Sequence, residues 1–483
     1  MIHKKFLRFA YFNHFSYFWL VFFYLLSFQA FSQSKAENTQ ITLLVTHSLR
    51  SNTLQMSKVY QYCKTKYPKG SFLLIDTGDP WDSHHFYDHF SQGKFSLDLM
   101  NLMGYHIASP SHEFLGQHWK EWDSLLKPSR FPWILSNLLR NGSYLFPPYW
   151  IFQKGSKRIA FLSIASPQYF KNPFFKKLFQ NTQIETPEKV LEKFLPSLFK
   201  QCDFIILVSQ CSPVNNIFCA SKFRNISLIL GRERHRTQSY FQKIGSTHIL
   251  WQAGKIPSFT EIHLIFKDGL PPQVQFRFIS LKKLPPSKEF LKTVELKKKI
   301  FDKKGWNTNL DHLFQKKISL KEARKFLSYL FCKNIQKETE ADLVLLHLPS
   351  FQNEWSQLSS LSLKKLWQTF PLPNQAFEIL LTGKGIRKIY QAKITEDLYC
   401  FGLKIKWNPK TKQKEFLING QLLQDQKAYH IVCVLDNQNI LFSNFPMKKI
   451  VKIIERDFFN PFVKDLKKQK YFNKIRSKGG NSQ

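Results

Sequence analysis

The sequence lacks several features that would narrow its function early. It has 483 residues, but only 34 Asp and Glu against 71 Lys and Arg, and only 18 Gly. Its seven cysteines include no Cys-x-x-Cys pair, which argues against zinc-binding and dithiol redox motifs. It also has no compact basic motif or aromatic-basic box, so no specific nucleic-acid site is predicted.

The proportions of hydrophobic and charged residues are those of a globular protein. Hydrophobic residues make up 43% and charged residues 22%, and a chain of this length usually folds as two domains. The net charge of +37 predicts attraction to anionic surfaces. The lysines are scattered along the chain and there are 48 Phe, so compositional drift toward Lys and Phe accounts for the charge without any selected partner and is the favoured interpretation. Both interpretations stay open.

The first residues have the pattern of an export signal. Three Lys or Arg precede an apolar run at 19–26, and Ala30 and Ser32 are small residues at a spacing suited to signal peptidase. The run is short for a membrane span, and no cysteine lies near it for a lipoprotein anchor. We therefore expect a signal peptide at 1–32 and an exported protein (periplasmic, cell-surface or secreted), with an uncleaved anchor as the alternative. No second transmembrane stretch is present.

Short apolar runs followed by polar loops recur from residue 41 to about 280. Continuous apolar runs of this length predict strands buried on both faces, between helices or in a sandwich of sheets. The runs are "ITLLV", "SFLLI", "RIAFLSI", "CDFIILV" and "ISLIL". Polar residues cluster where each run ends, which is where α/β proteins commonly build sites. Two alternating runs around Asp268-Gly269 predict a hairpin.

The stretch Asp76-Thr77-Gly78-Asp79 places two carboxylates on the loop after one of these strands. The glycine allows a tight turn between them. Carboxylates placed in this way usually serve a metal or a phosphate-transfer site, but two aspartates alone hold no catalytic metal. Other ligands have to come from elsewhere in the chain.

Changes in composition along the sequence predict four segments after the signal peptide. We expect a first domain at 33–281, a Lys-rich helical linker at 282–318, a second α/β domain at 319–470 and a basic tail at 471–483. Ser319 and Glu322 form a capping-box pattern at the start of the second domain.

Taken in order, these segments resemble the 5′-nucleotidase family over about residues 40 to 445. "DTGD", "LDLMNLMGYHIASPSHEFLGQHW", "RFPWILSNL" and "ISLILGRERH" follow its calcineurin-like metallophosphoesterase domain, and "AFEILLTGKGIRKIY" with "FLINGQLLQDQKAYHIVCVLDN" follow its C-terminal domain. The resemblance implies a two-sheet sandwich flanked by helices, followed by a second, smaller α/β domain. It also implies a nucleotide or phosphate ligand and a reaction that uses two divalent cations.

The sequence departs from the family at most of the implied metal-ligand positions. Asp76 and Asp79 match the carboxylates of the second motif, and His112 matches the catalytic His, with Leu115 in place of its acidic helper. The degenerate ligand positions are Ser48, Arg50, Ser111, Gln210, Arg232 and Arg234. Arginine has no lone pair to give a metal, and Ser and Gln are poor ligands for transition metals. Arg50, Arg232 and Arg234 either supply the charge that metals supply in the family or point to solvent.

We therefore expect an exported protein of 5′-nucleotidase lineage that has lost its dinuclear metal site, has no cofactor, and acts by binding or scaffolding. The alternative is an exported nucleotidase or phosphoesterase with an atypical ligand set, in which a divalent metal is bound by Asp76 and Asp79 and His112 is catalytic. Adhesion to an anionic surface is a third class.

Weaker candidates remain. Phe401 and Phe445 are implied to stack on a base, although packing explains them as well in a Phe-rich chain. His85 and Asp88 belong to a run with His84 and His89 that presents either an adventitious metal face or a solvated helix start. Export would permit disulfides, and Cys211 with Cys219 is the nearest pair.

Overall fold

The computed structural model describes the chain from 39 to 455 with gaps. The described residues are 39–68, 70–82, 85–111, 114–115, 122–171, 181–233, 236–254, 256–267, 269–302, 320–347, 362, 364, 375–391, 398–434 and 450–455. The predicted signal peptide, basic tail and capping-box serine lie outside them.

Two facing sheets form the first part of the chain, as the resemblance implied. One has the strand order β14-β13-β1-β2-β3 and the other β11-β12-β10-β9-β7-β6. The strands of the first sheet are β1 (Thr39–His47), β2 (Phe72–Asp76), β3 (Ile107–Ala108), β13 (Ser258–Phe266) and β14 (Gln273–Ile279). Those of the second are β6 (Tyr149–Lys154), β7 (Lys157–Ile164), β9 (Phe204–Ser209), β10 (Leu228–Glu233), β11 (Tyr240–Ile244) and β12 (Thr247–Ala253).

The five apolar runs are the inner strands β1, β2, β7, β9 and β10, so the prediction of buried strands is confirmed. One core lies between the sheets, where Leu43 and Ile75 of the first sheet belong to the same cluster as Phe161, Ile206 and Leu230 of the second. Every residue of β9 is buried, because helices cover its other face. The hairpin around Gly269 is also confirmed, as β13 pairs antiparallel with β14.

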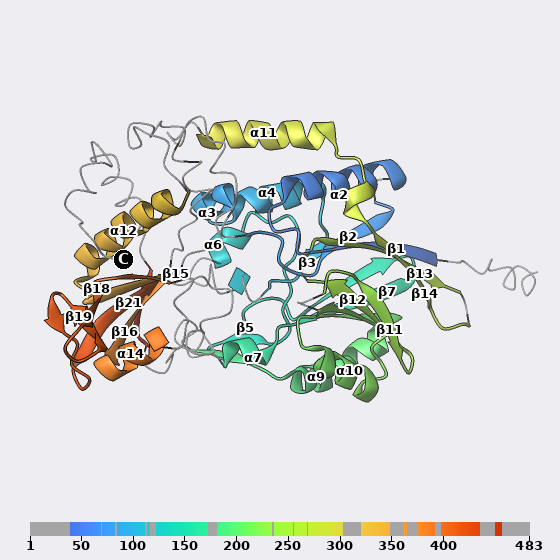
Figure 1. Cartoon of the computed structure of the whole chain (residues 1–483). Helices are drawn as coiled ribbons and strands as arrows, with labels where there is room; N and C mark the ends of the chain where they lie inside the picture. The colour runs from blue at the N-terminus through green and yellow to red at the C-terminus, as the bar shows by residue number, and fades with distance from the viewer. Residues whose placement is uncertain are drawn as a thin grey trace, which may run out of the picture.

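Helices cover both outer faces of the sandwich (Figure 1). Along the first sheet lie α2 (Thr53–Lys66), α3 (Phe86–Ser91), α4 (Lys94–Met103), α6 (Trp122–Leu126) and α11 (Lys288–Asp302). Along the second lie α9 (Pro187–Gln201) and α10 (Pro213–Lys222). The remaining short elements are β4 (Leu138–Arg140), β5 (Ser143–Tyr144), β8 (Thr182–Ile184), α7 (Pro167–Phe170) and the 3-10 turn η1 (Leu281–Lys283).

The helix expected in the linker is α11, and it is packed against the first domain. Phe290 and Val294 on it are buried, and the Phe290 ring lies 5.2 Å from that of Tyr60 on α2. Such burial of an apolar stripe holds the helix on α2 and leaves its Lys-rich face in solvent. The domain boundaries themselves remain a prediction.

The second part of the chain is a smaller mixed α/β unit. Its main sheet has the order β17-β15-β21-β16-β22, and a small sheet has the order β18-β19-β20. The elements are α12 (Leu320–Thr339), β15 (Leu343–His347), β16 (Gln375–Thr382), α14 (Gly383–Gln391), β17 (Leu398–Phe401), β18 (Leu403–Asn408), β19 (Gln413–Ile418), β20 (Gln421–Leu422), β21 (Ala428–Val434) and β22 (Ile450–Glu455). This two-part architecture confirms the predicted fold class.

Within the described part of the chain, an ionic contact joins the second unit to the first. Lys364 Nζ lies 2.8 Å from Asp302 Oδ2 at the end of α11, and it also donates to the hydroxyl of Tyr87 on α3. Among the described residues no helix is both long and apolar enough to cross a membrane.

The seven cysteines are free thiols, so the candidate disulfide between Cys211 and Cys219 is wrong. Sequence proximity does not supply the geometry of a disulfide, which needs Cβ atoms about 3.5–4.5 Å apart. Both thiols are instead buried in the core beneath α9 and α10.

Candidate functional site

The loops that follow the parallel strands meet at one edge of the sandwich. The loop after β1 is joined to the loop after β2 by backbone hydrogen bonds, with Ser48 N donating to Gly78 O at 3.0 Å and Arg50 N to Asp79 O at 3.0 Å. Ser48, Arg50 and Asp79 all have positive φ, at 55°, 47° and 55°. Left-handed backbone costs a non-glycine residue about 1–2 kcal/mol. The two loops are therefore held in a strained conformation, which is frequent at functional sites.

Asp79 lies at the centre of this edge and forms an ion pair with an arginine. Its Oδ2 is 3.0 Å from Arg232 Nη1 and 3.9 Å from Arg50 Nη2. The Asp79 side chain is fully buried and that of Arg232 is 6% exposed, whereas that of Arg50 is 32% exposed. Arg232 reaches this position because it lies near the end of β10, next to Gln252 on β12. Arg50 extends from the site toward solvent.

Asp76 has a different environment. Its side chain accepts hydrogen bonds from Thr46 Oγ1 at 2.9 Å and from Gly78 N at 2.9 Å, and Thr46 in turn contacts the hydroxyl of Tyr105 at 2.8 Å. Burial raises the pKa of Asp76 well above its usual range, which favours the neutral acid. Asp76 therefore stabilises the loop through its hydrogen bonds to Thr46 and Gly78.

His47 is a buried neutral imidazole beside the ion pair. Burial, and then the nearby Arg232 guanidinium, lower its pKa to about 3. Its Nδ1 lies 3.2 Å from Thr77 Oγ1, and that hydroxyl lies within hydrogen-bond distance of both Gln252 Oε1 and Thr46 O, to one of which it donates its single proton.

Ser111 and Gln210 close the next side of the site. Gln210 Nε2 donates to Pro110 O at 2.9 Å, and a Cβ placed on Gly78 would lie 3.1 Å from the same nitrogen and 3.5 Å from Ser111 Cβ. Gly78 has φ +131°, so the turn expected between the two carboxylates does require glycine. Ser111 Oγ accepts from Phe114 N at 3.2 Å and so serves the local backbone.

The described side chains at this edge do not by themselves fit two divalent cations. Arg232 and Arg50 lie where ligands would be needed, and a guanidinium stays protonated and offers no lone pair. The resemblance implies a bridging role for Asp79, but its Oδ2 already lies against Arg232. Within the described ranges there is no group of three or more His, Cys, Asp or Glu that could hold a metal ion.

The other predicted residues fall into two groups. His112, Arg234 and Phe445 lie outside the described residues. Phe401, on β17, is half-buried, and its ring lies 5.4 Å from that of Tyr329 on α12 in an edge-on arrangement. A role for Phe401 in base stacking therefore stays a prediction.

The run around His85 is engaged in helix capping. Asp88 accepts from Ser96 N at 2.8 Å and from Ser96 Oγ at 2.6 Å at the start of α4, and His85 Nδ1 lies 3.3 Å from Asp88 Oδ2. His84 lies outside the described residues. The Asp88 carboxylate thus has a structural role that accounts for its burial.

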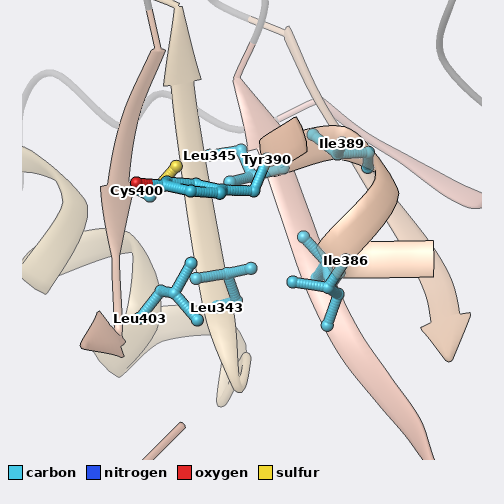
Figure 2. Close-up of a pocket in the computed structure, with 8 residues that line it drawn as sticks. Leu343, Leu345, Ile386, Ile389, Tyr390, Cys400 and Leu403 are labelled. Atoms are coloured by element: carbon cyan, nitrogen blue, oxygen red, sulfur yellow. The ribbon is translucent and has the colours of Figure 1, made fainter. Parts of the chain in front are cut away.

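An apolar pocket in the second unit lies between α14 and the main sheet (Figure 2). Its wall includes Leu343, Leu345, Ile386 and Cys400, and the space between them is small. Figure 2 shows Ile386 on one side facing Leu343 and Leu403 on the other. Its lining has no charged side chain that could hold a phosphate, so it does not resemble a nucleotide site.

Sequence reasoning missed Thr77 and Gln252. Gln252 comes from the end of β12, 175 positions after Thr77, and no motif links the two. The available signal was a glutamine at the end of the apolar run Ile249 to Trp251, where an α/β sheet commonly builds a site.

Comparison with known proteins agrees with the fold. No protein-family model matches the chain, and no curated protein matches its sequence. Among solved structures, a Staphylococcus aureus protein assigned as a 5′-nucleotidase and crystallised with alpha-ketoglutarate aligns with a TM-score of 0.65 at 12% identity, over 89% of this chain and 97% of that one. A 5′-nucleotidase precursor from Thermus thermophilus aligns with a TM-score of 0.57 at 13% identity, over 90% and 97%.

The Thermus thermophilus sulfate thiohydrolase SoxB, in complex with glycerol, aligns with a TM-score of 0.53 at 16% identity, over 87% of this chain and 80% of that one. Proteins named for different substrates therefore share this architecture, and the architecture alone fixes no reaction. At these identities the comparisons establish the fold, and the chain has the two-domain fold of the 5′-nucleotidases.

Proposed function

We propose that this chain is a 5′-nucleotidase-fold protein that acts by binding or scaffolding and not by metal-dependent hydrolysis. The observation that carries the proposal is the ion pair between Arg232 and Asp79, 3.0 Å long with both side chains buried. In this proposal Arg232 and Arg50 supply the positive charge that two cations supply in the family that the sequence resembles.

Electrostatics supports the exchange of metal for arginine. A carboxylate buried without a positive partner is costly, so loss of the cations would leave Asp79 in need of one. Arginine is suited to the task because its charge is permanent and its planar donors match a carboxylate. Ser48 and Gln210 fit the same account, since neither side chain carries a charge that would compete with the guanidinium groups.

Export belongs to the same proposal. The pattern at 1–32 favours a secreted or periplasmic protein, and one of the similar structures is of a nucleotidase precursor. The net charge of +37 would then face an environment rich in anionic lipid or polysaccharide. Attraction of this kind is a secondary property and should disappear as salt is raised.

The test is hydrolysis of a nucleoside monophosphate and of an aryl phosphate in the presence of manganese or zinc. We expect no measurable turnover. General acid-base help from His112 would contribute only about 10²–10⁴-fold, far less than phosphate monoester hydrolysis requires. Turnover that is abolished by both Asp79→Asn and His112→Ala would contradict the proposal. It would favour instead an enzyme with an atypical ligand set around Asp76, Asp79 and His112.

A further inference from the structure

The outward side of α11 carries two large apolar side chains. Leu296 is 53% exposed and Ile300 is 68% exposed. Residues four positions apart are neighbours on a helix surface, so these two form one apolar patch. The buried Phe290 and Val294 lie on another side of the helix, and their packing leaves the patch uncovered. Two exposed apolar side chains are ordinary on a protein surface, so their neighbours decide what the patch is for.

Exposed lysines accompany the patch. Lys292 lies one helical turn before Leu296, Lys299 is adjacent to Ile300, and Lys288 lies one turn before Lys292. None of these three lysines has an ion-pair partner among the described residues. The acidic side chains of α11 are already paired with other lysines: Glu289 with Lys64, Glu295 with Lys298 and Asp302 with Lys364. The outward side of α11 therefore combines an apolar pair with a row of positive charges.

Helix α10, on the other face of the sandwich, shows the difference that these charges make. It also exposes two apolar side chains one turn apart, Val214 at 75% and Phe218 at 44%. The lysine of α10, Lys222, lies 3.5 Å from Glu188 and 2.9 Å from Glu192 on α9, so its charge is matched. The apolar pair of α10 thus lacks the positive row that accompanies the pair of α11.

The position of α11 makes its outward side accessible to a flat surface. In Figure 1 the helix runs above α2 and α4, as the layer farthest from the first sheet. Its 15 residues correspond to a length of about 22 Å. A helix with exposed aliphatic side chains beside lysines is typical of proteins that lie in the headgroup region of a membrane.

We propose that α11 docks this protein on an anionic lipid surface, with Leu296 and Ile300 entering the headgroup region and the three lysines contacting lipid phosphates. Charge favours lipid over a second copy of the chain, because a two-fold contact through this side would bring like charges together. The aliphatic pair favours lipid over nucleic acid, because neither side chain has a ring on which a base stacks. The inference deepens the attraction to anionic surfaces within the proposed function and rests on that part of it.

The test follows contact at α11 itself, since the apolar run at 19–26 would also attach the full-length chain to lipid. Full-length protein is mixed with vesicles of equal parts phosphatidylglycerol and phosphatidylcholine, or of phosphatidylcholine alone, at about 0.15 M salt. A water-soluble acetylating reagent and mass spectrometry then report the reactivity of each lysine. We expect the anionic vesicles to protect Lys292 and Lys299 severalfold. Lys200 on α9 and Lys243 on β11 are exposed lysines of the other face and should react as before.

The apolar pair is tested by the double variant Leu296→Gln with Ile300→Gln. It should raise the lipid concentration needed for half-protection of Lys299 by about tenfold, because apolar area no longer enters the lipid. The matched control is Val214→Gln with Phe218→Gln on α10, which should leave that concentration unchanged. Circular dichroism verifies that each variant is folded.

The positive row is tested by Lys292→Gln with Lys299→Gln, followed at Lys288. Half-protection should need about 25-fold more lipid, since each lysine near an anionic surface contributes about fivefold. The control, Lys200→Gln with Lys243→Gln, lowers the net charge by the same amount. It should have a much smaller effect, because those lysines lie away from α11.

Four results would overturn the inference. The first is unchanged reactivity of Lys292 and Lys299 in vesicle-bound protein, and the second is a control pair that acts as strongly as its test pair. The third is unchanged protection in Leu296→Gln with Ile300→Gln, which would indicate a general polyanion surface. The fourth is a dimer, seen by light scattering, that the same variant abolishes, since a second copy would then cover the patch. Failure of the proposed function is distinguishable, because it appears as metal-dependent turnover and leaves lysine protection unchanged.

Discussion

Removal of the charge of Asp79 should destabilise this protein strongly. Arg232 is 6% exposed and lies 3.0 Å from a carboxylate that is fully buried. The variant Asp79→Asn removes the negative charge that lies 3.0 Å from that buried guanidinium. Breaking a buried pair in this way costs about 3–5 kcal/mol, and we expect the lower end, since the amide oxygen still accepts a hydrogen bond. Asparagine is preferred to alanine because residue 79 has φ 55°, which Asn tolerates.

The double variant Asp79→Asn with Arg232→Met should recover part of the loss. Residues in contact couple, typically by about 0.5–3 kcal/mol, so the double variant should be more stable than additivity predicts. The surface pair of Arg387 and Asp425 is the control, because their side chains are 31% and 53% exposed. Asp425→Asn should change the free energy of unfolding by less than about 1 kcal/mol.

Denaturant unfolding of each variant in chelator measures these effects. In an intact metal site without its metals, loss of Asp79 would instead relieve repulsion between carboxylates. A neutral or stabilising Asp79→Asn would therefore refute the role of arginine as the counter-charge.

Three further outcomes follow from the structure. Because burial lowers the pKa of His47 from 6.5 to about 3, the unfolded chain binds a proton there before the folded chain does, and stability is lost as pH falls from 6.5 toward 3. Between pH 6.5 and 5, wild type should lose about 1–2 kcal/mol more than His47→Gln in urea unfolding, and equal slopes would contradict this. Gly78→Ala should lower the free energy of unfolding by about 1–3 kcal/mol, since φ there is +131° and the new Cβ would lie 3.1 Å from Gln210 Nε2; an unchanged midpoint would exclude the strain. Alkylation after unfolding without reductant should modify all seven cysteines, and reaction of folded protein should be slow at Cys211, whose pKa burial raises to about 12; a mass two groups short would indicate a disulfide.

Most of the fold could be predicted from the sequence because its central strands are buried on both faces. Such strands appear as unbroken apolar runs, and β1, β2, β7, β9 and β10 are those runs. Strands of the second unit could also be predicted, because they too appear as apolar runs in the sequence. The packing of α11 onto α2 could not be predicted from the sequence. Only two side chains of this Lys-rich helix are buried, so its sequence pattern is that of a solvent-exposed linker.

The site could be predicted only in part. Asp79 could be predicted as a site residue because it lies on a glycine-containing loop directly after a buried strand. The direction of Arg232 and Arg50 could not be derived from the sequence, since an arginine on a loop is as consistent with solvent as with a buried carboxylate. Thr77 and Gln252 were missed because only the packing of the two sheets brings β2 and β12 together.

The metal content of the purified protein tests the central claim most directly. The protein would be soaked with manganese or zinc, passed through a desalting column and submitted to elemental analysis, with Asp79→Asn treated in parallel. The account predicts less than one tightly bound ion per chain and no difference between wild type and Asp79→Asn. Two tightly bound ions per chain in wild type, lost in Asp79→Asn, would contradict it.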